Sequence, residues 1–188
     1  MNIAVFASGG GTNFENIVNH FNQSGTARVT LMLCNNSKAG VLERASRLGI
    51  ESQVLNRAQF NDENVLMPLL REHNIDFIVL AGFLLMVPGF LIDAYDRRMI
   101  NLHPALLPRH GGKGMYGHHV HEAVIADGDT ETGITIHYVS RVCDGGEIIA
   151  QFSTPVNPGD TADDVAASIH ILEQAHFPNV IEQVIANL

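Results

Sequence analysis

The hydrophobic pattern of the first hundred residues alternates between short apolar runs and stretches with helical spacing. Residues 76–82, for example, form a continuous apolar run of the kind found in strands buried on both faces. Residues 13–21 instead place Phe14, Ile17, Val18 and Phe21 on one side of a helix. The pattern predicts strands at 3–7, 28–35, 50–55, 76–82 and 98–103, and helices at 13–21, 40–49, 61–74 and 87–95.

The second half of the chain has a different pattern. A helix is predicted at 118–127, and two segments with period-two alternation, 132–139 and 146–156, predict an antiparallel strand pair. A last helix begins at Thr161, which forms a capping box with Asp164, and we expect Pro178 to kink or restart it. The whole order predicts one α/β domain over residues 1–188: a Rossmann-like parallel sheet with an antiparallel C-terminal extension.

Composition narrows the class of protein. The chain has 188 residues, 46% of them hydrophobic, and a formal net charge of −9. This charge disfavours non-specific binding to nucleic acid. Neither a signal peptide nor a membrane-spanning run is visible, and the two cysteines, Cys34 and Cys143, lie far apart. These features favour a cytoplasmic protein. The expected partners are small molecules, and the expected assembly is a monomer or weak homodimer.

A glycine-rich stretch, Ser8 to Asn13, separates the first strand from the first helix. Backbone amides in such a loop, together with the helix N-terminus, can bind a phosphate. The stretch lacks the Lys-Ser/Thr ending of a Walker loop, and the second strand is not followed by the acidic residue of a dinucleotide site. A single phosphate or an unliganded tight turn both remain compatible with the sequence.

Asn101 and His103 follow the fifth strand and, two residues apart, should share one face at its C-terminal end. An amide can donate to an oxyanion, and an imidazole can move a proton near neutral pH. Asp144 could set the charge of the histidine or pass a proton through water. Taken singly, each of these residues is better explained by a structural role.

Two other types of site are disfavoured. His118, His119 and His121 suggest zinc, but adjacent histidines would point apart on a helix and no further ligand is spaced to join them. We therefore expect no metal. Cys143 has no evident activating partner, so we expect a thiol without a catalytic role.

Six stretches carry a resemblance to a known family: VFASGGGTN, LAGFLLMVP, INLHPALLP, GDTETGITIHYV, DGGEIIAQ and LEQAHFP. In order and spacing they are similar to the phosphoribosylglycinamide formyltransferases, a branch of the folate-dependent formyltransferase family. The resemblance covers nearly the whole chain. It implies the formyltransferase fold and transfer of a formyl group from 10-formyltetrahydrofolate to the amine of glycinamide ribonucleotide, a step of purine (IMP) biosynthesis.

The resemblance also implies roles for matched residues. It places phosphate binding in residues 1–100, and catalysis and folate binding in 101–188. Asn101, His103 and Asp144 would be catalytic, and protonated His103 would pair with Asp144. Glu173 would bind the substrate amine. The ribonucleotide phosphate would be held by Gly10, Gly11, Thr12 and Asn13. Folate would be bound by Leu85, Met86, Val87, Val139, Ser140, Arg141, Val142 and Cys143. His119 and His137 would support the site, and Leu107-Pro108 matches a cis peptide bond.

The sequence departs from the family pattern in the segment from Arg109 to His118, which is longer and rich in glycine, and at Leu85, where many relatives carry Arg. Alternatives are a formyltransferase for another acceptor, a formyltetrahydrofolate hydrolase, or a binding module without catalysis. The intact trio of Asn101, His103 and Asp144 argues against the last.

Overall fold

The computed structural model describes residues 1–188 and contains one mixed seven-stranded sheet in the order β3-β2-β1-β4-β5-β6-β7. Strands β1 to β5 pair in parallel, whereas β5–β6 and β6–β7 are antiparallel. The predicted α/β class, with an antiparallel extension at the C-terminal edge, is confirmed. The strands are β1 (Asn2–Ala7), β2 (Arg28–Cys34), β3 (Glu51–Val54), β4 (Phe77–Leu80), β5 (Met99–His103), β6 (Glu131–Tyr138) and β7 (Ile148–Pro155).

The helices follow the predicted order, with one addition. The short helix α3 was not expected, although Asn56 and Gln59 form a capping box at its start. The helices are α1 (Thr12–Ser24), α2 (Val41–Leu48), α3 (Arg57–Phe60), α4 (Glu63–Glu72), α5 (Gly89–Ala94), α6 (His118–Ala126) and α7 (Ala162–Ala186). No helix is both long and apolar enough to span a membrane.

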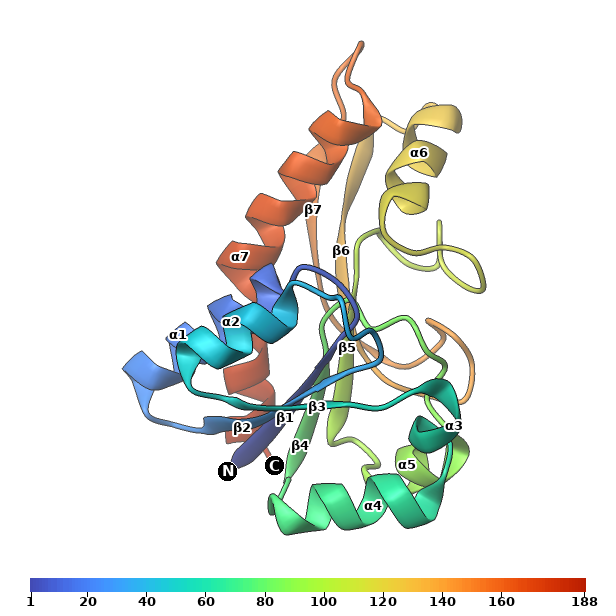
Figure 1. The fold of residues 1–188 in the computed structure, drawn as a ribbon. Helices are drawn as coiled ribbons and strands as arrows, with labels where there is room; N and C mark the ends of the chain where they lie inside the picture. The colour runs from blue at the N-terminus through green and yellow to red at the C-terminus, as the bar shows by residue number, and fades with distance from the viewer.

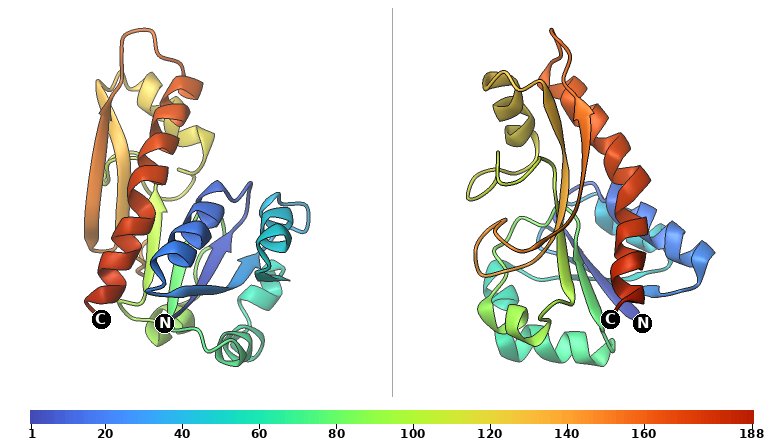
Figure 2. Two further views of the ribbon diagram at one scale, coloured as in Figure 1. Left: turned by 90° about the vertical axis from the view of Figure 1, so that its left-hand side faces the viewer. Right: turned by 180° about the vertical axis from the view of Figure 1, so that it is seen from behind.

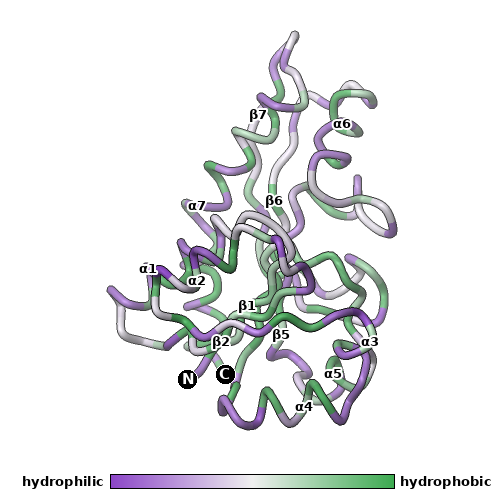
Figure 3. The backbone as a smooth tube through the Cα atoms, in the orientation of Figure 1, coloured by the Kyte–Doolittle hydropathy of each residue, from purple (hydrophilic) through white to green (hydrophobic).

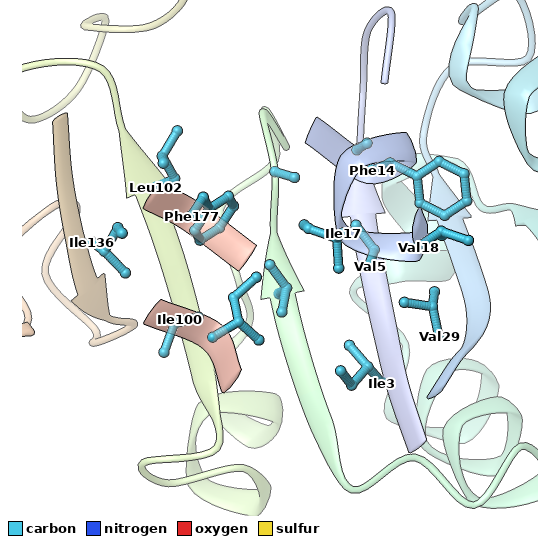
Figure 4. Close-up of a cluster of buried hydrophobic side chains, with 14 of the residues drawn as sticks. Ile3, Val5, Phe14, Ile17, Val18, Val29, Ile100, Leu102, Ile136 and Phe177 are labelled. Carbon is cyan, nitrogen blue, oxygen red and sulfur yellow. The ribbon is translucent and has the colours of Figure 1, made fainter. Parts of the chain in front are cut away.

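The two faces of the sheet are covered by different helices (Figures 1 and 2). Successive residues of β1 alternate between two apolar clusters, so that Ile3 and Val5 pack with α1, α2 and α7, while Ala4 and Phe6 pack with α3, α4 and α5. The apolar segments run through the strands at the centre of the molecule (Figure 3). In the first cluster, Phe14 and Ile17 of α1 and Phe177 of α7 lie against the sheet (Figure 4).

Helix α7 continues through Pro178, so the expected restart of the helix at this residue is wrong. Proline has no N–H, and the carbonyl of Gln174, four residues earlier, therefore loses its helical donor. The side-chain amide of Asn16, on α1, donates to that carbonyl at 2.9 Å. A neighbouring helix thus replaces the missing hydrogen bond, and the buried Pro178 is accommodated within one helix.

Candidate active site

A pocket lies where the strand order reverses, near the carboxyl ends of β1 and β4. The loops after these strands are tied together, because the amide of Ser8 donates to the carbonyl of Gly82 at 3.0 Å and the amide of Leu84 donates to the Ser8 hydroxyl at 2.9 Å. The pocket has a volume of about 460 Å³ and opens between the loop after β4, Asn13 at the start of α1, β5 and the 112–117 segment. This volume is sufficient for small-molecule ligands.

The glycine loop before α1 adopts a conformation that only glycine allows. Gly11 has a φ of 80°, and a Cβ atom there would lie 2.5 Å from Cγ2 of Val41. No hydrogen bond within the protein uses the amides of Gly10, Gly11 or Thr12 as donors. Free amides at the N-terminus of a thirteen-residue helix, α1, are suited to binding an anion.

Four polar side chains share one face of the β5–β6 pair. Asn101 lies opposite His137 and His103 opposite Thr135, whereas the alternating Ile100 and Leu102 face the apolar cluster of α7. The predicted common face of Asn101 and His103 is therefore confirmed. His137 Nδ1 donates to the carbonyl of Tyr138 at 2.9 Å, so its Nε2 accepts from Asn101 Nδ2 at 3.1 Å. This bond orients the Asn101 amide and leaves its second hydrogen free.

Asp144 reaches this face because the connection between β6 and β7 folds back over it. Asp144 itself has a φ of 53°, and a Cβ on Gly146 would lie only 1.7 Å from the carbonyl oxygen of Tyr138. The Asp144 carboxylate accepts from the amide of Gly112 at 2.9 Å and lies 3.6 Å from His103 Nδ1 and 3.7 Å from His137 Nε2. The loop thus brings together the catalytic trio expected from the resemblance.

The electrostatics differ from the expected pairing of Asp144 with a protonated His103. Burial lowers the pKa of His103, and this effect exceeds the raising effects of Asp144 and of the hydrogen bond to the His110 carbonyl. Burial raises the pKa of Asp144, but the neighbouring His137 and His103 and the hydrogen bond from the Gly112 amide together outweigh it, so the net pKa is lowered. The unliganded site therefore favours a neutral imidazole beside an ionised carboxylate.

Glu173 enters the same pocket from α7 and accepts from the Asn13 amide at 3.0 Å. Gln174 donates to the other end of the Asn13 side chain at 2.9 Å. Burial raises the pKa of Glu173, more than Asn13 and the nearby His170 lower it. Asn13 consequently joins the start of α1 to the one carboxylate of α7 that lines the pocket.

Most of the residues expected to contact folate line the pocket, with one exception. The guanidinium of Arg141 pairs with Asp93 at 2.6 Å, and Arg141 is the only member of the expected set that is absent from the pocket wall. Arg141 thus lies outside the pocket wall, and its expected contact with folate stays a prediction. The lining members are Leu85, Met86, Val87, Val139, Ser140, Val142 and Cys143. Burial raises the pKa of the Cys143 thiol, which disfavours a reactive thiolate.

The histidines of α6 also differ from expectation. His119 is 63% exposed, pairs with Glu122 and does not line the pocket, and its expected supporting role stays a prediction. His121 is buried instead and lines the pocket wall. Its placement follows from the helical spacing with the buried Val120 and Val124. Sequence reasoning also missed Arg57 and Lys113, which line the pocket from α3 and from the glycine-rich segment.

The remaining local predictions concern a peptide bond and a metal. The Leu107-Pro108 bond is cis, as the resemblance implied. No three His, Cys, Asp or Glu side chains gather in an arrangement that could hold a metal ion.

Comparison with known proteins places this geometry in a family. A model of the formyl transferase family matches residues 1–181. The chloroplastic phosphoribosylglycinamide formyltransferase of Vigna unguiculata is 39% identical over 96% of this chain, and the chain spans 59% of that protein's length. The Bacillus subtilis phosphoribosylglycinamide formyltransferase is 36% identical over 97% of this chain and 93% of its own length.

Solved structures agree with these relatives. The phosphoribosylglycinamide formyltransferase of Bacillus halodurans superposes with a TM-score of 0.88 at 32% identity, covering 98% of this chain and 95% of its own. The Streptococcus pneumoniae TIGR4 enzyme gives a TM-score of 0.85 at 36% identity, with 98% of both chains covered.

Proposed function

The chain belongs to the formyl transferase family, and we propose that it transfers a formyl group from 10-formyltetrahydrofolate to the amine of glycinamide ribonucleotide. The observation that supports this most strongly is the convergence of Asn101, His103 and Asp144 in a pocket whose rim also carries Asn13 and Glu173. Relatives that bear this enzyme's name match along almost the full chain. A ribonucleotide site and a folate site can thus meet at one polar centre.

The pocket and the glycine loop beside Asn13 each have a proposed ligand. The free amides of Gly10, Gly11 and Thr12, with Asn13, bind the ribonucleotide phosphate. Glu173 binds the glycyl amine. The apolar wall that includes Met86, Val87 and Val142 binds the folate ring system, since Met86 and Val142 are exposed hydrophobic side chains at the pocket mouth.

The proposed reaction is a direct attack of the neutral amine on the formyl carbon. A carbon–nitrogen bond forms, and the carbonyl oxygen of the tetrahedral intermediate becomes an oxyanion. The free hydrogen of the Asn101 amide donates to this oxyanion. Holding both substrates in one pocket supplies a separate entropic advantage.

Proton transfer completes the reaction. His103 donates through Nε2 to the His110 carbonyl, and Nδ1 is therefore the nitrogen free to accept the proton that leaves the amine. Asp144 then stabilises the imidazolium as it forms. The proton passes to N10 of the folate, the bond between N10 and the formyl carbon breaks, and tetrahydrofolate and the formylated ribonucleotide leave.

The test mixes purified protein with 10-formyltetrahydrofolate, with and without glycinamide ribonucleotide, and follows deformylated folate by absorbance. Product formation that requires the ribonucleotide is expected. Product formed equally without it would identify a hydrolase, and no product in either mixture would overturn the proposed activity.

Two substitutions test the roles in the reaction. Asn101→Ala and Asp144→Asn are each expected to lower kcat by on the order of 100-fold or more, with little effect on the KM for the ribonucleotide. Asp163→Asn is a matched control, because its side chain is 92% exposed on the first turn of α7. Near-normal turnover by either pocket variant would refute its assigned role.

A further inference from the structure

The glycine-rich segment after the cis peptide makes two main-chain contacts with the reacting pair. The carbonyl of His110 accepts from His103 Nε2 at 2.8 Å, and the amide of Gly112 donates to Asp144 at 2.9 Å. Three consecutive residues therefore present an acceptor to the imidazole and a donor to the carboxylate. A Cβ on Gly111 would lie 2.4 Å from Cδ2 of Leu107, so any larger residue between the two contacts would have to displace the Leu107 side chain.

The sequence of this segment does not fix its own conformation. Gly112, Gly114 and Gly117 all have positive φ, and glycine loses the most conformational freedom on folding. His110 itself has a φ of 52°, a left-handed conformation that is unfavourable for a residue with a side chain. Contacts outside the main chain must therefore hold residues 110–112 in place.

The side chain of His110 supplies such a contact on the far side of the loop. It does not line the pocket, and its Nε2 lies 2.6 Å from Oδ2 of Asp129, in the turn before β6. The second oxygen of Asp129 pairs with Arg109 Nη2 at 2.5 Å. The side chains of His110 and Asp129 are each only 7% exposed. A carboxylate buried to this extent is costly unless it is paired and hydrogen-bonded, so the contacts of Asp129 with His110 and Arg109 should be well ordered.

We propose that Asp129, His110 and Arg109 form a positioning clamp that sets the tautomer of His103 and holds Asp144 through the main chain of residues 110–112. This inference rests on the proposed function, because it assigns Nδ1 of His103 as the proton acceptor. A fixed acceptor on one ring nitrogen of a catalytic histidine keeps the proton there and leaves the other nitrogen free to act as a base. The clamp residues themselves do not touch the substrates.

The clamp makes a specific prediction for catalysis. Asp129→Asn and His110→Ala retain every side chain of the pocket wall but release the loop. The kcat for formyl transfer should fall at least about 10-fold, while the KM values for both substrates change little. In other enzymes, removing a carboxylate that fixes the tautomer of a catalytic histidine lowers kcat roughly 10⁴-fold. The decrease in kcat should be smaller here, because the His110 carbonyl is displaced and not removed.

The pH profile should also change. The titratable groups that face His103 are Asp144, His110, His137 and His121. Loss of the His110 carbonyl removes a contact that raises the pKa of His103. The acidic limb of kcat/KM should therefore move to lower pH in Asp129→Asn, a shift that general loosening of the fold would not produce.

Two further variants separate positioning from simple destabilisation. His110→Gln keeps a side-chain donor for Asp129 and should recover most of the kcat that His110→Ala loses. Glu182→Gln is the matched control, because it breaks another histidine–carboxylate pair, with His20 at 2.8 Å, between α1 and α7. Glu182→Gln should leave kcat and the pH profile unchanged.

A measurement without substrates keeps this inference distinguishable from the proposed function. The ¹⁵N shifts of the His103 ring in the free protein should report a neutral ring protonated at Nε2, and Asp129→Asn should yield a mixture of tautomers. A single unchanged tautomer in folded Asp129→Asn would overturn the clamp, whether or not the wild-type protein transfers formyl groups. A wild-type protein that shows the expected tautomers without formyl transfer would overturn only the proposed function.

Discussion

The contact between Asn16 and the Gln174 carbonyl predicts a coupling between two residues on different helices. Pro178 removes the amide that would pair with this carbonyl, and Asn16 supplies the replacement donor at 2.9 Å. Asn16→Ala should therefore destabilise the protein, whereas the same substitution in a Pro178→Ala background should cost little. In that background the helix provides its own amide to Gln174.

The expected size follows from hydrogen-bond energetics. Leaving a partly buried carbonyl without a partner costs about 1–3 kcal/mol, so Asn16→Ala should lower the free energy of unfolding by about 1.5 kcal/mol. For a chain of this length that corresponds to a decrease of about 3–6 °C in Tm. With Pro178→Ala present the loss should shrink to about 0.5 kcal/mol, which gives a coupling energy near 1 kcal/mol.

Urea unfolding of the wild type, the two single variants and the double variant measures this coupling directly. Asn19→Ala is the control, because Asn19 is exposed on the same helix. This substitution brings the same gain in helix propensity as Asn16→Ala but removes no hydrogen bond to the Gln174 carbonyl. The reasoning is refuted if Asn16→Ala is as stable as Asn19→Ala. The reasoning is also refuted if Asn16→Ala lowers the free energy of unfolding by the same amount with Pro178 and with Ala at position 178.

Two further predictions concern stability. Thr135→Val should cost about 2–4 kcal/mol in urea unfolding, because the fully buried hydroxyl accepts from the Leu107 amide and donates to the Ala105 carbonyl. Thr30→Val, which removes a buried hydroxyl without a partner, should cost nothing or stabilise. Glu173 has a raised pKa, so the folded state loses stability as pH rises from 4.5 through the folded-state pKa. Glu173→Gln should therefore raise Tm at pH 7 but not at pH 4, and an equal shift at both would contradict this sign.

The elements that sequence reasoning predicted well are those whose pattern is local. The continuous run at Phe77–Leu80 is buried on both faces, as a continuous apolar run in a parallel strand should be. Helix α7 shows the limit of this approach, because a proline breaks a helix in isolation. The donor that rescues the Gln174 carbonyl lies 158 residues away in the sequence.

The candidate site shows the same division. The common face of Asn101 and His103 follows from strand geometry alone, and the spacing of α6 could have identified His121 as the buried histidine instead of His119. The charge of His103 could not be predicted, since it depends on how deeply the folded chain buries the ring. Arg141 turns away because Asp93, from α5, is close enough to pair with it.

The net charge of −9 does not exclude anionic ligands, because a ligand responds to the electric field at its binding site and not to the total charge. Arg44 and Arg47, behind the glycine loop, both pair with Glu15, so one positive charge near the loop stays uncompensated. Arg57 and Lys113, by contrast, line the pocket and form no ion pair with any carboxylate of the protein. An anionic substrate in the pocket would therefore meet uncompensated positive charge at Arg57 and Lys113, although the chain as a whole is negative. The sequence-level argument against nucleic acid holds for broad surfaces, whereas this concave site can favour small anions.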